Sequence, residues 1–314
     1  MGKLAFVFPG QGSQAVGMGK DLHEQFDTAR AIFKAADQAL GISITDMCFN
    51  GPEEELKKTY NTQPAILTVS IACYEVLKQH GIKPDIVAGH SLGEYSALVA
   101  AGSLSFSDAV QLVRKRGQFM QEAVPLGEGS MAAIIGLDRD KVVEICRQVE
   151  AEVGEVQAVN FNCPGQIVIA GTTAAVEKAN ELLKAAGAKR AILLPVSAPF
   201  HSTLMRPAAQ RLGSEFDKIS INDAEIPVIA NVTGKTVTEG LEIKQLLVKQ
   251  AASPVLWEDC IAEITKLGAT TFIEVGPGKV LAGFTKKIAK EVATLNIEDT
   301  NSLEKILDYF KEVR

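Results

Sequence analysis

Short apolar runs alternate with longer segments of helical periodicity along most of the chain. The apolar runs have the length of buried strands and are bounded by turn residues; they lie at 4–8, 85–88, 227–232 and 271–275. Apolar residues at helical spacing predict helices at 28–40, 63–80, 94–102, 108–124 and 243–252. Strands that alternate with helices in this way favour an α/β fold with a parallel sheet.

The pattern changes after a linker at 125–129. Strands are predicted at 130–137, 156–161, 166–170 and 191–196, and helices at 138–149 and 174–186. This β-α-β-β-α-β order is that of a ferredoxin-like unit. We therefore expect residues 126–197 to form a small ferredoxin-like domain inserted into a core made of 1–125 and 198–314. A cleft between two such domains is a common place for a substrate.

The stretch Gly89-His90-Ser91-Leu92-Gly93 stands between the strand at 85–88 and the helix that ends near Gly102. A G-x-S-x-G sequence in this strand-to-helix context is typical of a nucleophile elbow, in which glycines allow the close approach of strand and helix. The elbow would expose the Ser91 hydroxyl and direct the first free helix amides, including that of Leu92, at an oxyanion. An ordinary tight turn is the alternative. His90 is not expected to be the base, because neighbouring side chains diverge at such a turn.

A glycine-rich loop, Pro9 to Ala15, follows the first strand and matches G-x-G-x-x-A. A dinucleotide-binding turn would require a second strand ending in Asp or Glu, but a helix is predicted at 28–40. A phosphate-binding loop of the Walker type would require lysine where Met18 stands. The loop could instead bring its backbone amides and Gln11 close to a ligand, or be a plain connection.

Arg116 lies on the apolar stripe of the helix at 108–124, between Val113 and Met120. A guanidinium on a buried face requires an anionic partner, since leaving it unpaired would be strongly unfavourable. That partner could be an internal carboxylate or a carboxylate supplied by a substrate. The spacing leaves both interpretations open.

Among the four histidines, His201 is the best candidate for a general base. It follows the nucleophile in chain order, as in other elbow-type serine enzymes, and lies at the junction of the two predicted domains. The alternative is a polar residue in a proline-containing loop. No Asp or Glu between Ser91 and His201 stands at the end of a plausible core strand, so a neutral group would have to orient His201.

Composition narrows the class of protein. At 314 residues with 46% hydrophobic and 22% charged, the chain is expected to be globular, and the net charge of -6 argues against broad nucleic-acid binding. No apolar run approaches a membrane span, and no secretory signal is present, so a cytosolic location is expected. Neither the histidines nor the cysteines have the spacing of metal ligands; the cysteines are Cys48, Cys73, Cys146, Cys163 and Cys260.

Taken together, these motifs resemble the malonyl-CoA:acyl carrier protein transacylases, an acyltransferase family that loads malonyl groups for fatty acid synthesis. The resemblance covers essentially the whole chain. The matching segments are Phe8–Gln14, Gln63–Ala65, Gly89–Tyr95, Arg116–Gly117, Asn160–Asn162, Pro199–His201, Asn231–Val232, Gln250 and Glu274–Gly278. The family has a hydrolase-like α/β core with a ferredoxin-like insert, which agrees with the boundaries above.

The resemblance implies a role for each matching residue. Ser91 would be the acylated nucleophile and His201 its base, oriented by the main-chain carbonyl of Gln250. The amides of Gln11 and Leu92 would form the oxyanion hole. The residues that would bind the substrate are Arg116, as the clamp for the malonyl carboxylate, with Met120, Gln63, Asn160, Phe200 and Asn231. Leu92 and Phe200 match the malonyl-selecting pattern rather than the methylmalonyl one. Leu256 departs from the family, where arginine is common.

The implied reaction is a two-step acyl transfer, from malonyl-CoA to Ser91 and then to the phosphopantetheine thiol of an acyl carrier protein. No permanently bound cofactor and no metal are needed, and a monomer is expected. The alternatives are a serine hydrolase such as a thioesterase, a polyketide-type acyltransferase, and a noncatalytic binding module. Carriers are acidic, so docking requires a local basic patch. The candidates are Lys189 with Arg190 in the insert, and Lys286 with Lys287 and the nearby Lys290 in the core, on segments expected to flank the cleft.

Overall fold

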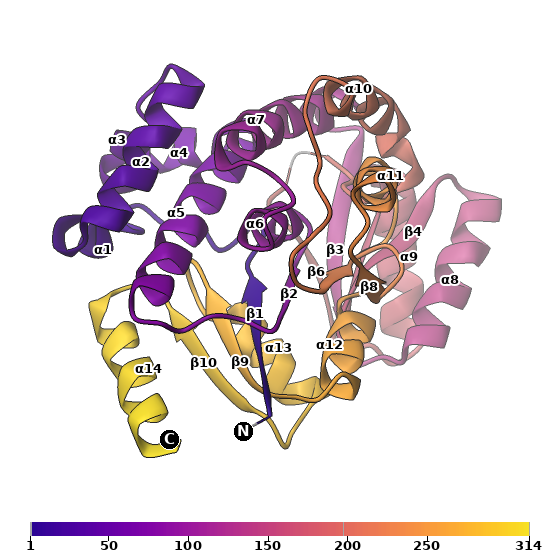
Figure 1. Cartoon of the computed structure of the whole chain (residues 1–314). Coiled ribbons are helices and arrows are strands. Elements are labelled where there is room, and N and C mark those ends of the chain that lie inside the picture. Colours follow the sequence, from indigo (N-terminus) through magenta and orange to yellow (C-terminus); the bar gives the residue numbers. More distant parts are fainter. Residues whose placement is uncertain (1, 197, 314) are drawn as a thin grey trace.

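The computed structural model describes residues 2–196 and 198–313. Its larger sheet has the strand order β10-β9-β1-β2-β7-β8 (Figure 1). The strands are β1 (Lys3–Phe8), β2 (Ile86–Gly89), β7 (Val228–Ala230), β8 (Lys235–Val237), β9 (Ala269–Val275) and β10 (Ala293–Ile297). All neighbours pair in parallel except β7 and β8, which are antiparallel. The prediction of an α/β fold with a parallel sheet is confirmed.

The central strand β1 is buried on both faces. Phe6 and Phe8 belong to the core under α5 (Thr59–Gln79) and α6 (Gly93–Ala100), whereas Ala5 and Val7 face α12 (Trp257–Lys266) and α13 (Val280–Ile288). A strand covered on both sides reads as a continuous apolar run, which is why 4–8 was recognisable in the sequence.

The remaining helices of this part are α1 (Lys20–Gln25), α2 (Asp27–Leu40), α3 (Ile44–Asn50), α4 (Glu53–Leu56), α7 (Phe106–Glu122), the 3₁₀ turn η1 (Thr203–Met205), α10 (Arg206–Phe216), α11 (Gly240–Gln250) and α14 (Thr300–Val313). Most of them pack on other helices, whereas α14 packs on the edge strand β10. Helix α7 packs along α5 and buries Arg116 between them and the sheet. Helix α11 ends at Gln250, which is fully buried beside the end of β2.

Helix α5 begins before the expected start at Gln63. Its first turn is polar, and this hid it from a search for apolar periodicity. The polar side chains are buried and bonded to the preceding helix: Asn61 Nδ2 donates to the carbonyl of Glu55 at 2.9 Å, and Thr62 Oγ1 donates to that of Leu56. Satisfied polar groups can therefore extend a buried helix where periodicity alone predicts a loop.

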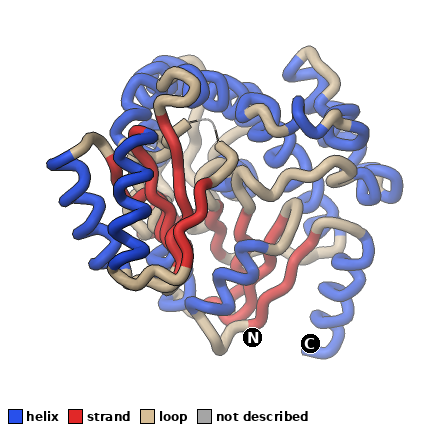
Figure 2. Tube along the Cα trace, turned by 180° about the vertical axis from the view of Figure 1, so that it is seen from behind, coloured by secondary structure: helices blue, strands red, loops and turns tan. Residues whose placement is uncertain are grey.

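The smaller sheet lies between Gly129 and Leu193 and is fully antiparallel, with the order β4-β5-β3-β6. Its elements are β3 (Gly129–Ile135), α8 (Arg139–Glu152), β4 (Val156–Cys163), β5 (Gln166–Thr172), α9 (Thr173–Ala185) and β6 (Arg190–Leu193). Helices α8 and α9 cover one face of this sheet (Figure 2). The element order and the pairing are those of a ferredoxin-like unit. The domain limits stay a prediction; Met1, Ser197 and Arg314, which fall on them, lie outside the described residues.

The two sheets are joined along β4. The main chain of β4 forms a parallel bridge with the segment before α12, in which Val255 N donates to Val159 O at 2.8 Å and Phe161 N donates to Val255 O at 3.0 Å. The next residue, Leu256, packs against the core of the smaller sheet. The residue that departs from the family pattern therefore lies at the junction, where an apolar side chain adds to the packing.

All five cysteines are buried and unpaired. Among the helices that the structure describes, none is both long enough and apolar enough to cross a membrane.

Candidate active site

Ser91 lies at the sharp turn between β2 and α6. Its φ is +53°, a left-handed value that is uncommon for a residue with a side chain. The flanking glycines leave no room for a Cβ: one added to Gly89 would lie 1.9 Å from the carbonyl carbon of Gly93, and one added to Gly93 would lie 2.0 Å from the carbonyl oxygen of Phe8. The glycines are thus required by direct contact between backbones, as expected of an elbow.

His201 is the hydrogen-bond partner of Ser91. Its Nε2 lies 2.7 Å from Ser91 Oγ, and its Nδ1 lies 2.9 Å from the main-chain carbonyl oxygen of Gln250. A carbonyl oxygen only accepts, so Nδ1 carries the hydrogen and Nε2 is free to accept the proton of Ser91. The histidine is oriented by a neutral group, and its φ is +65°.

The imidazole is held neutral by its surroundings. Burial and, second to it, the positive charge of Arg116 lower the pKa of His201 from 6.5 to about 3. His201 is only 3% exposed. At neutral pH the ring is therefore unprotonated and can act as a base.

Two backbone amides next to Ser91 are available for an oxyanion. Within residues 2–196 and 198–313, neither Leu92 N nor Gln11 N donates a hydrogen bond. Gln11 comes from the glycine-rich loop, which lies against the elbow: a Cβ on Gly10 would be 2.4 Å from the carbonyl oxygen of His90. The sequence left two interpretations of this loop, a ligand-facing loop and a plain connection. Its position beside Ser91 favours the first.

Arg116 is 1% exposed and has only neutral acceptors. Its Nη1 donates to Gln63 Oε1 at 2.9 Å, and its Nη2 donates to Gln250 Oε1 at 2.9 Å and to Ser91 Oγ at 3.1 Å. In the described part of the chain, no carboxylate forms an ion pair with it. A buried, unpaired guanidinium beside a nucleophile can receive a carboxylate from a ligand.

A cavity of about 100 Å³ between the two sheets is lined by Gln11, Ser91, Arg116 and His201, whereas Leu92 and Gln250 are outside its lining. Of the residues expected to bind substrate, Arg116, Met120, Gln63, Asn160 and Phe200 line it. The cavity wall also includes residues of the smaller sheet and its exit that sequence reasoning missed: Met131, Leu194 and Val196. Their apolar character marks them as core residues in the sequence, with no signal of a site.

Asn231 was expected to bind substrate, and the structure places it outside the cavity lining. It is fully buried beneath the elbow, where its Oδ1 accepts from Ser91 N at 2.7 Å and its Nδ2 donates to Gly89 O at 2.7 Å. These bonds hold the backbone around Ser91. His90 does line the cavity, but its Nε2 is occupied by Asn162 Oδ1 at 2.8 Å, as expected of a residue that is not the base.

Neither basic pair is part of the cavity lining. Arg190 is paired with Ile135 at the start of β6, whereas Leu194, past its end, reaches the cavity. Strand residues advance about 3.3 Å each, so Lys189 and Arg190 lie at the end of β6 that is far from the cavity. The sequence-based expectation was that they would flank the cleft. Lys287 is near Cys163, whose thiol pKa its charge lowers against the dominant effect of burial. Both pairs are exposed and lie beside the β4–β5 turn.

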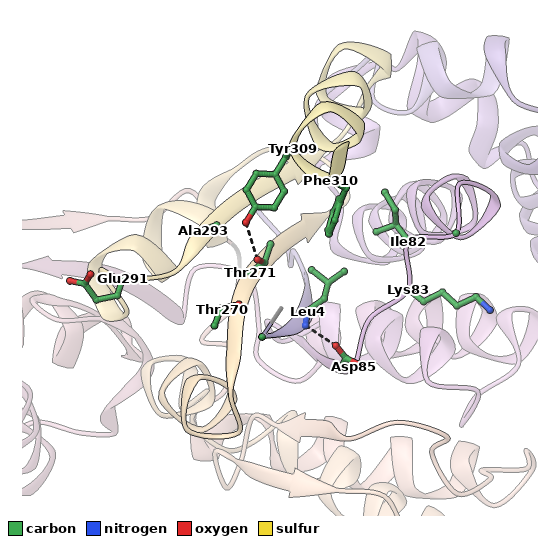
Figure 3. A pocket seen from close by; sticks show the side chains of 12 residues that line it. Leu4, Ile82, Lys83, Asp85, Thr270, Thr271, Glu291, Ala293, Tyr309 and Phe310 are labelled. Carbon is green, nitrogen blue, oxygen red and sulfur yellow. Dashed lines mark hydrogen bonds between the residues drawn. The ribbon is translucent and has the colours of Figure 1, made fainter. Parts of the chain in front are cut away.

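A larger cavity, of about 470 Å³, lies at the opposite ends of the main-sheet strands from Ser91 (Figure 3). It is lined by the residues at the starts of β1, β2, β9 and β10 and by Tyr309 and Phe310 of α14. Tyr309 Oη and Thr271 Oγ1 are hydrogen bonded there at 3.1 Å. Among the described residues that line it there is no serine, cysteine or histidine, so the chemistry is assigned to the smaller cavity. Nowhere in the described chain do three or more His, Cys, Asp or Glu residues form a possible metal site.

Known proteins are similar to this chain over nearly its whole length. The model of the acyl transferase domain family matches residues 5–306. A malonyl CoA-acyl carrier protein transacylase of Bacillus subtilis is 53% identical over 312 residues, which cover 99% of this chain and 98% of the relative. A transacylase of the same name from Escherichia coli K12 is 49% identical over 309 residues, covering 98% and 100%.

Solved structures give the same result. The malonyl CoA-acyl carrier protein transacylase of Clostridium perfringens superposes with a TM-score of 0.96 at 48% identity, covering 99% of this chain and 98% of the other. A malonyl-transacylase solved in complex with its type II polyketide acyl carrier protein superposes with a TM-score of 0.95 at 45% identity, covering 98% and 99%.

Proposed function

The chain belongs to the acyl transferase domain family, and from this we propose that it transfers the malonyl group of malonyl-CoA to the phosphopantetheine thiol of an acyl carrier protein. It is a transacylase of fatty acid synthesis that uses a CoA thioester as substrate and needs no permanently bound cofactor. The observation that carries the proposal is the position of Ser91 Oγ, which is hydrogen bonded both to His201 Nε2 and to Arg116 Nη2. A nucleophile, its base and a carboxylate receptor share one small cavity.

In the first step, Ser91 Oγ attacks the thioester carbonyl of malonyl-CoA and gives its proton to His201 Nε2. The oxyanion that forms accepts hydrogen bonds from the amides of Gln11 and Leu92. When the carbon–sulfur bond breaks, His201 returns the proton to the leaving sulfur, and free CoA departs from a malonyl ester on Ser91.

In the second step, the carrier's phosphopantetheine thiol gives its proton to His201 and attacks the ester carbonyl. The bond to Ser91 Oγ breaks, and the serine takes the proton back. Malonyl thioester on the carrier and free enzyme are the products. Throughout, Arg116 binds the malonyl carboxylate, while Met120, Gln63, Asn160 and Phe200 surround the acyl group in the cavity.

A thioesterase with the same elbow is the runner-up from the sequence. Such an enzyme has no use for a guanidinium that is 1% exposed and unpaired beside the nucleophile. Burying an unpaired charge is strongly unfavourable, so the arrangement favours a substrate that carries its own carboxylate.

Intact-mass measurement tests the proposal. Malonyl-CoA is expected to add one malonyl group to the protein, and carrier protein with its phosphopantetheine is expected to remove it. Ser91→Ala should show no adduct. Acylation of the Ser91→Ala variant, or loss of the adduct to water as fast as to the carrier, would contradict the proposed function.

For the carrier, we propose docking on the basic pairs Lys189 with Arg190 and Lys286 with Lys287. The support is their exposure and their common position beside the β4–β5 turn, on a chain whose net charge is -6. We also propose a monomer that works in the cytosol. One chain supplies Ser91, His201 and Arg116, and the buried, unpaired cysteines are typical of a reducing compartment.

A further inference from the structure

Glu94 lies one turn beyond the nucleophile on α6, is 2% exposed, and has no role in the mechanism above. Its Oε2 accepts two hydrogen bonds: from Gln250 Nε2 at 2.7 Å and from Asn231 N at 3.2 Å. Its carboxylate bonds neither to Ser91 Oγ nor to His201 among the residues that the structure describes. Burial raises the pKa of this carboxyl to about 7, while the hydrogen bonds from Gln250 and Asn231 and the charge of Arg116 act to lower it. A carboxylate in this place requires a reason, because desolvation is unfavourable to its charge.

One of its partners, Gln250, is hydrogen bonded to His201, Arg116 and the main chain of Ser91. Its main-chain oxygen accepts from His201 Nδ1, and its side-chain Oε1 accepts from Arg116 Nη2. Its Nε2 donates to Glu94 and, at 2.8 Å, to the main-chain oxygen of Ser91. The Ser91 carbonyl oxygen only accepts and the Arg116 guanidinium only donates, so these two groups fix the amide with its nitrogen toward Ser91 O and Glu94 and its oxygen toward Arg116.

The other partner, Asn231, holds the elbow. Its side chain bonds to Ser91 N and Gly89 O, and its own main-chain N–H is the group that Glu94 accepts. Glu94 is therefore hydrogen bonded to both residues whose buried amide side chains support the elbow, to the side chain of Gln250 and to the main chain of Asn231. Glu94 connects three segments that are distant in sequence: the start of α6, the end of β7 and the end of α11.

The arrangement also answers the question of the anionic partner of Arg116. The guanidinium has no direct carboxylate partner, but Glu94 is the carboxylate whose charge acts on it. The Gln250 amide stands between them, with its oxygen bonded to the cation and its nitrogen to the anion. Ionised Glu94 thus compensates the charge of Arg116 through the Gln250 amide. The guanidinium forms no direct ion pair with Glu94 and stays open to a carboxylate from the substrate.

We propose that Glu94 is a positioning residue for acyl transfer, which holds Arg116 for the substrate carboxylate through Gln250 and supports the Ser91 elbow through Asn231. This inference rests on the proposed function. Hydrogen bonds to an ionised acceptor are about twice as strong as neutral ones, so Glu94 stiffens the arrangement most above its pKa of about 7.

The test is Glu94→Gln, which keeps the shape of the side chain and removes its charge. The rate of Ser91 acylation, as kcat/KM, is measured with malonyl-CoA and with acetyl-CoA. We expect malonyl acylation to fall about tenfold or more, as loss of a charged hydrogen-bond partner predicts. Acetyl acylation should fall less, because acetyl has no carboxylate for Arg116, and the malonyl-to-acetyl ratio should therefore drop.

Glu274→Gln is the matched control. Glu274 is also a fully buried glutamate, and its Oε2 accepts from Ala282 N at 2.8 Å at the start of α13, away from the cavity. That variant can change thermal stability but should leave the malonyl-to-acetyl ratio unchanged. On an Arg116→Ala background, Glu94→Gln should lower the ratio no further, since its effect on selectivity passes through Arg116.

A second variant keeps the test decisive if Glu94→Gln fails to fold. Gln250→Ala keeps the main-chain carbonyl that orients His201 and removes only the side chain between Glu94 and Arg116. It should reproduce the drop in the ratio. Equal losses with malonyl-CoA and acetyl-CoA in the Glu94 and Gln250 variants would overturn the inference and make Glu94 a structural residue. The proposed function fails separately, if the unaltered protein is not malonylated on Ser91.

Discussion

Ser91 and His201 share a backbone property besides their hydrogen bond. In the described chain they are the two residues other than glycine that have a positive φ. Such a conformation is unfavourable for a residue with a side chain and persists when its surroundings fix it. Here the fixing bonds are those from Ser91 N to Asn231 and from His201 Nδ1 to the carbonyl of Gln250. The backbone is held where the chemistry needs it, against local preference.

Substitution of Ser91 should therefore separate stability from activity. Ser91→Gly removes the nucleophile and the steric conflict together, so we expect an inactive protein that is more stable than Ser91→Ala by about 1 kcal/mol. Chemical denaturation of the two variants measures the difference. Equal stabilities would mean that the left-handed conformation carries no strain.

The lowered pKa of His201 predicts an acid sensitivity of folding. The unfolded histidine binds a proton below pH 6.5 and the folded one only below about 3, so between these values the unfolded state holds more protons and stability falls as the pH falls. The slope from this residue approaches about 1.4 kcal/mol per pH unit. His201→Asn should lack this contribution. Denaturation of both proteins between pH 7 and pH 4 checks it, and parallel stability curves would contradict the lowered pKa.

Arg116→Ala should lose malonyl transfer selectively. Removing one partner of a buried charged contact costs about 2 to 5 kcal/mol, so acylation by malonyl-CoA should fall by about 30-fold or more. Acetyl acylation should fall less, although the bond from Arg116 to Ser91 Oγ makes some loss certain. Arg116→Lys keeps the charge but not the fork and should be intermediate. A common factor for both thioesters would make Arg116 a structural residue.

At the scale of elements, the elbow depends on how closely the start of α6 approaches the end of β1. Gly89 and Gly93 stand where two backbones touch, and the amide of Leu92 is left free on the side of the cavity. The same contact brings the glycine-rich loop after β1 beside Ser91. One close approach therefore provides both the exposed nucleophile and two oxyanion donors.

Gly93→Ala should break this approach, since its Cβ would lie 2.0 Å from the carbonyl oxygen of Phe8. We expect a loss of more than about 3 kcal/mol of stability, as for overpacking against a backbone that cannot move, and no measurable acylation. Gly283→Ala is the control, because this helical glycine on α13 has open space around it. That change should stabilise the protein by about 0.5 to 1 kcal/mol. A stable, active Gly93→Ala protein would contradict the proposed contact.

The sequence predicted what short-range patterns carry. Strand 4–8, the elbow and the stripe of α7 with Arg116 follow from apolar runs, glycines and helical spacing. The antiparallel strand β8 has only three residues, of which two are exposed, and is too short to be recognised. The bonds that Glu94 makes to Asn231 and Gln250 join residues more than 130 positions apart, and no local pattern reports such pairing. Asn231 was therefore assigned to the cavity, although it supports the elbow from behind.

At the scale of the whole molecule, the balance of charge matters most for the partner. The chain is acidic overall, yet it has two exposed basic pairs beside the β4–β5 turn. One pair, Lys189 and Arg190, lies at the start of β6, and the other, Lys286 and Lys287, lies on α13. A local positive field on an acidic protein can steer an acidic partner to one face.

Reversing Lys286 and Lys287 to Glu should raise the KM for carrier protein and flatten its dependence on salt, because screening acts on the charges that were removed. Acylation by malonyl-CoA should stay nearly unchanged. Lys305→Glu with Lys311→Glu on α14 makes the same change in net charge on exposed helix positions elsewhere and should leave the KM for the carrier nearly as it was. If both double variants behave alike, the pair on α13 is not a docking site.

The burial of the cysteines has a consequence for chemoselectivity. The substrate and the product of the proposed reaction are both thioesters, and thiolates exchange spontaneously with thioesters. An accessible thiolate on the enzyme would collect acyl groups off the pathway. Burial raises the pKa of all five thiols and keeps them protonated and out of reach. The protein can thus present Ser91 as its single nucleophile to thioesters. Its resistance to acylation of its cysteines is a property of the core rather than of the catalytic residues.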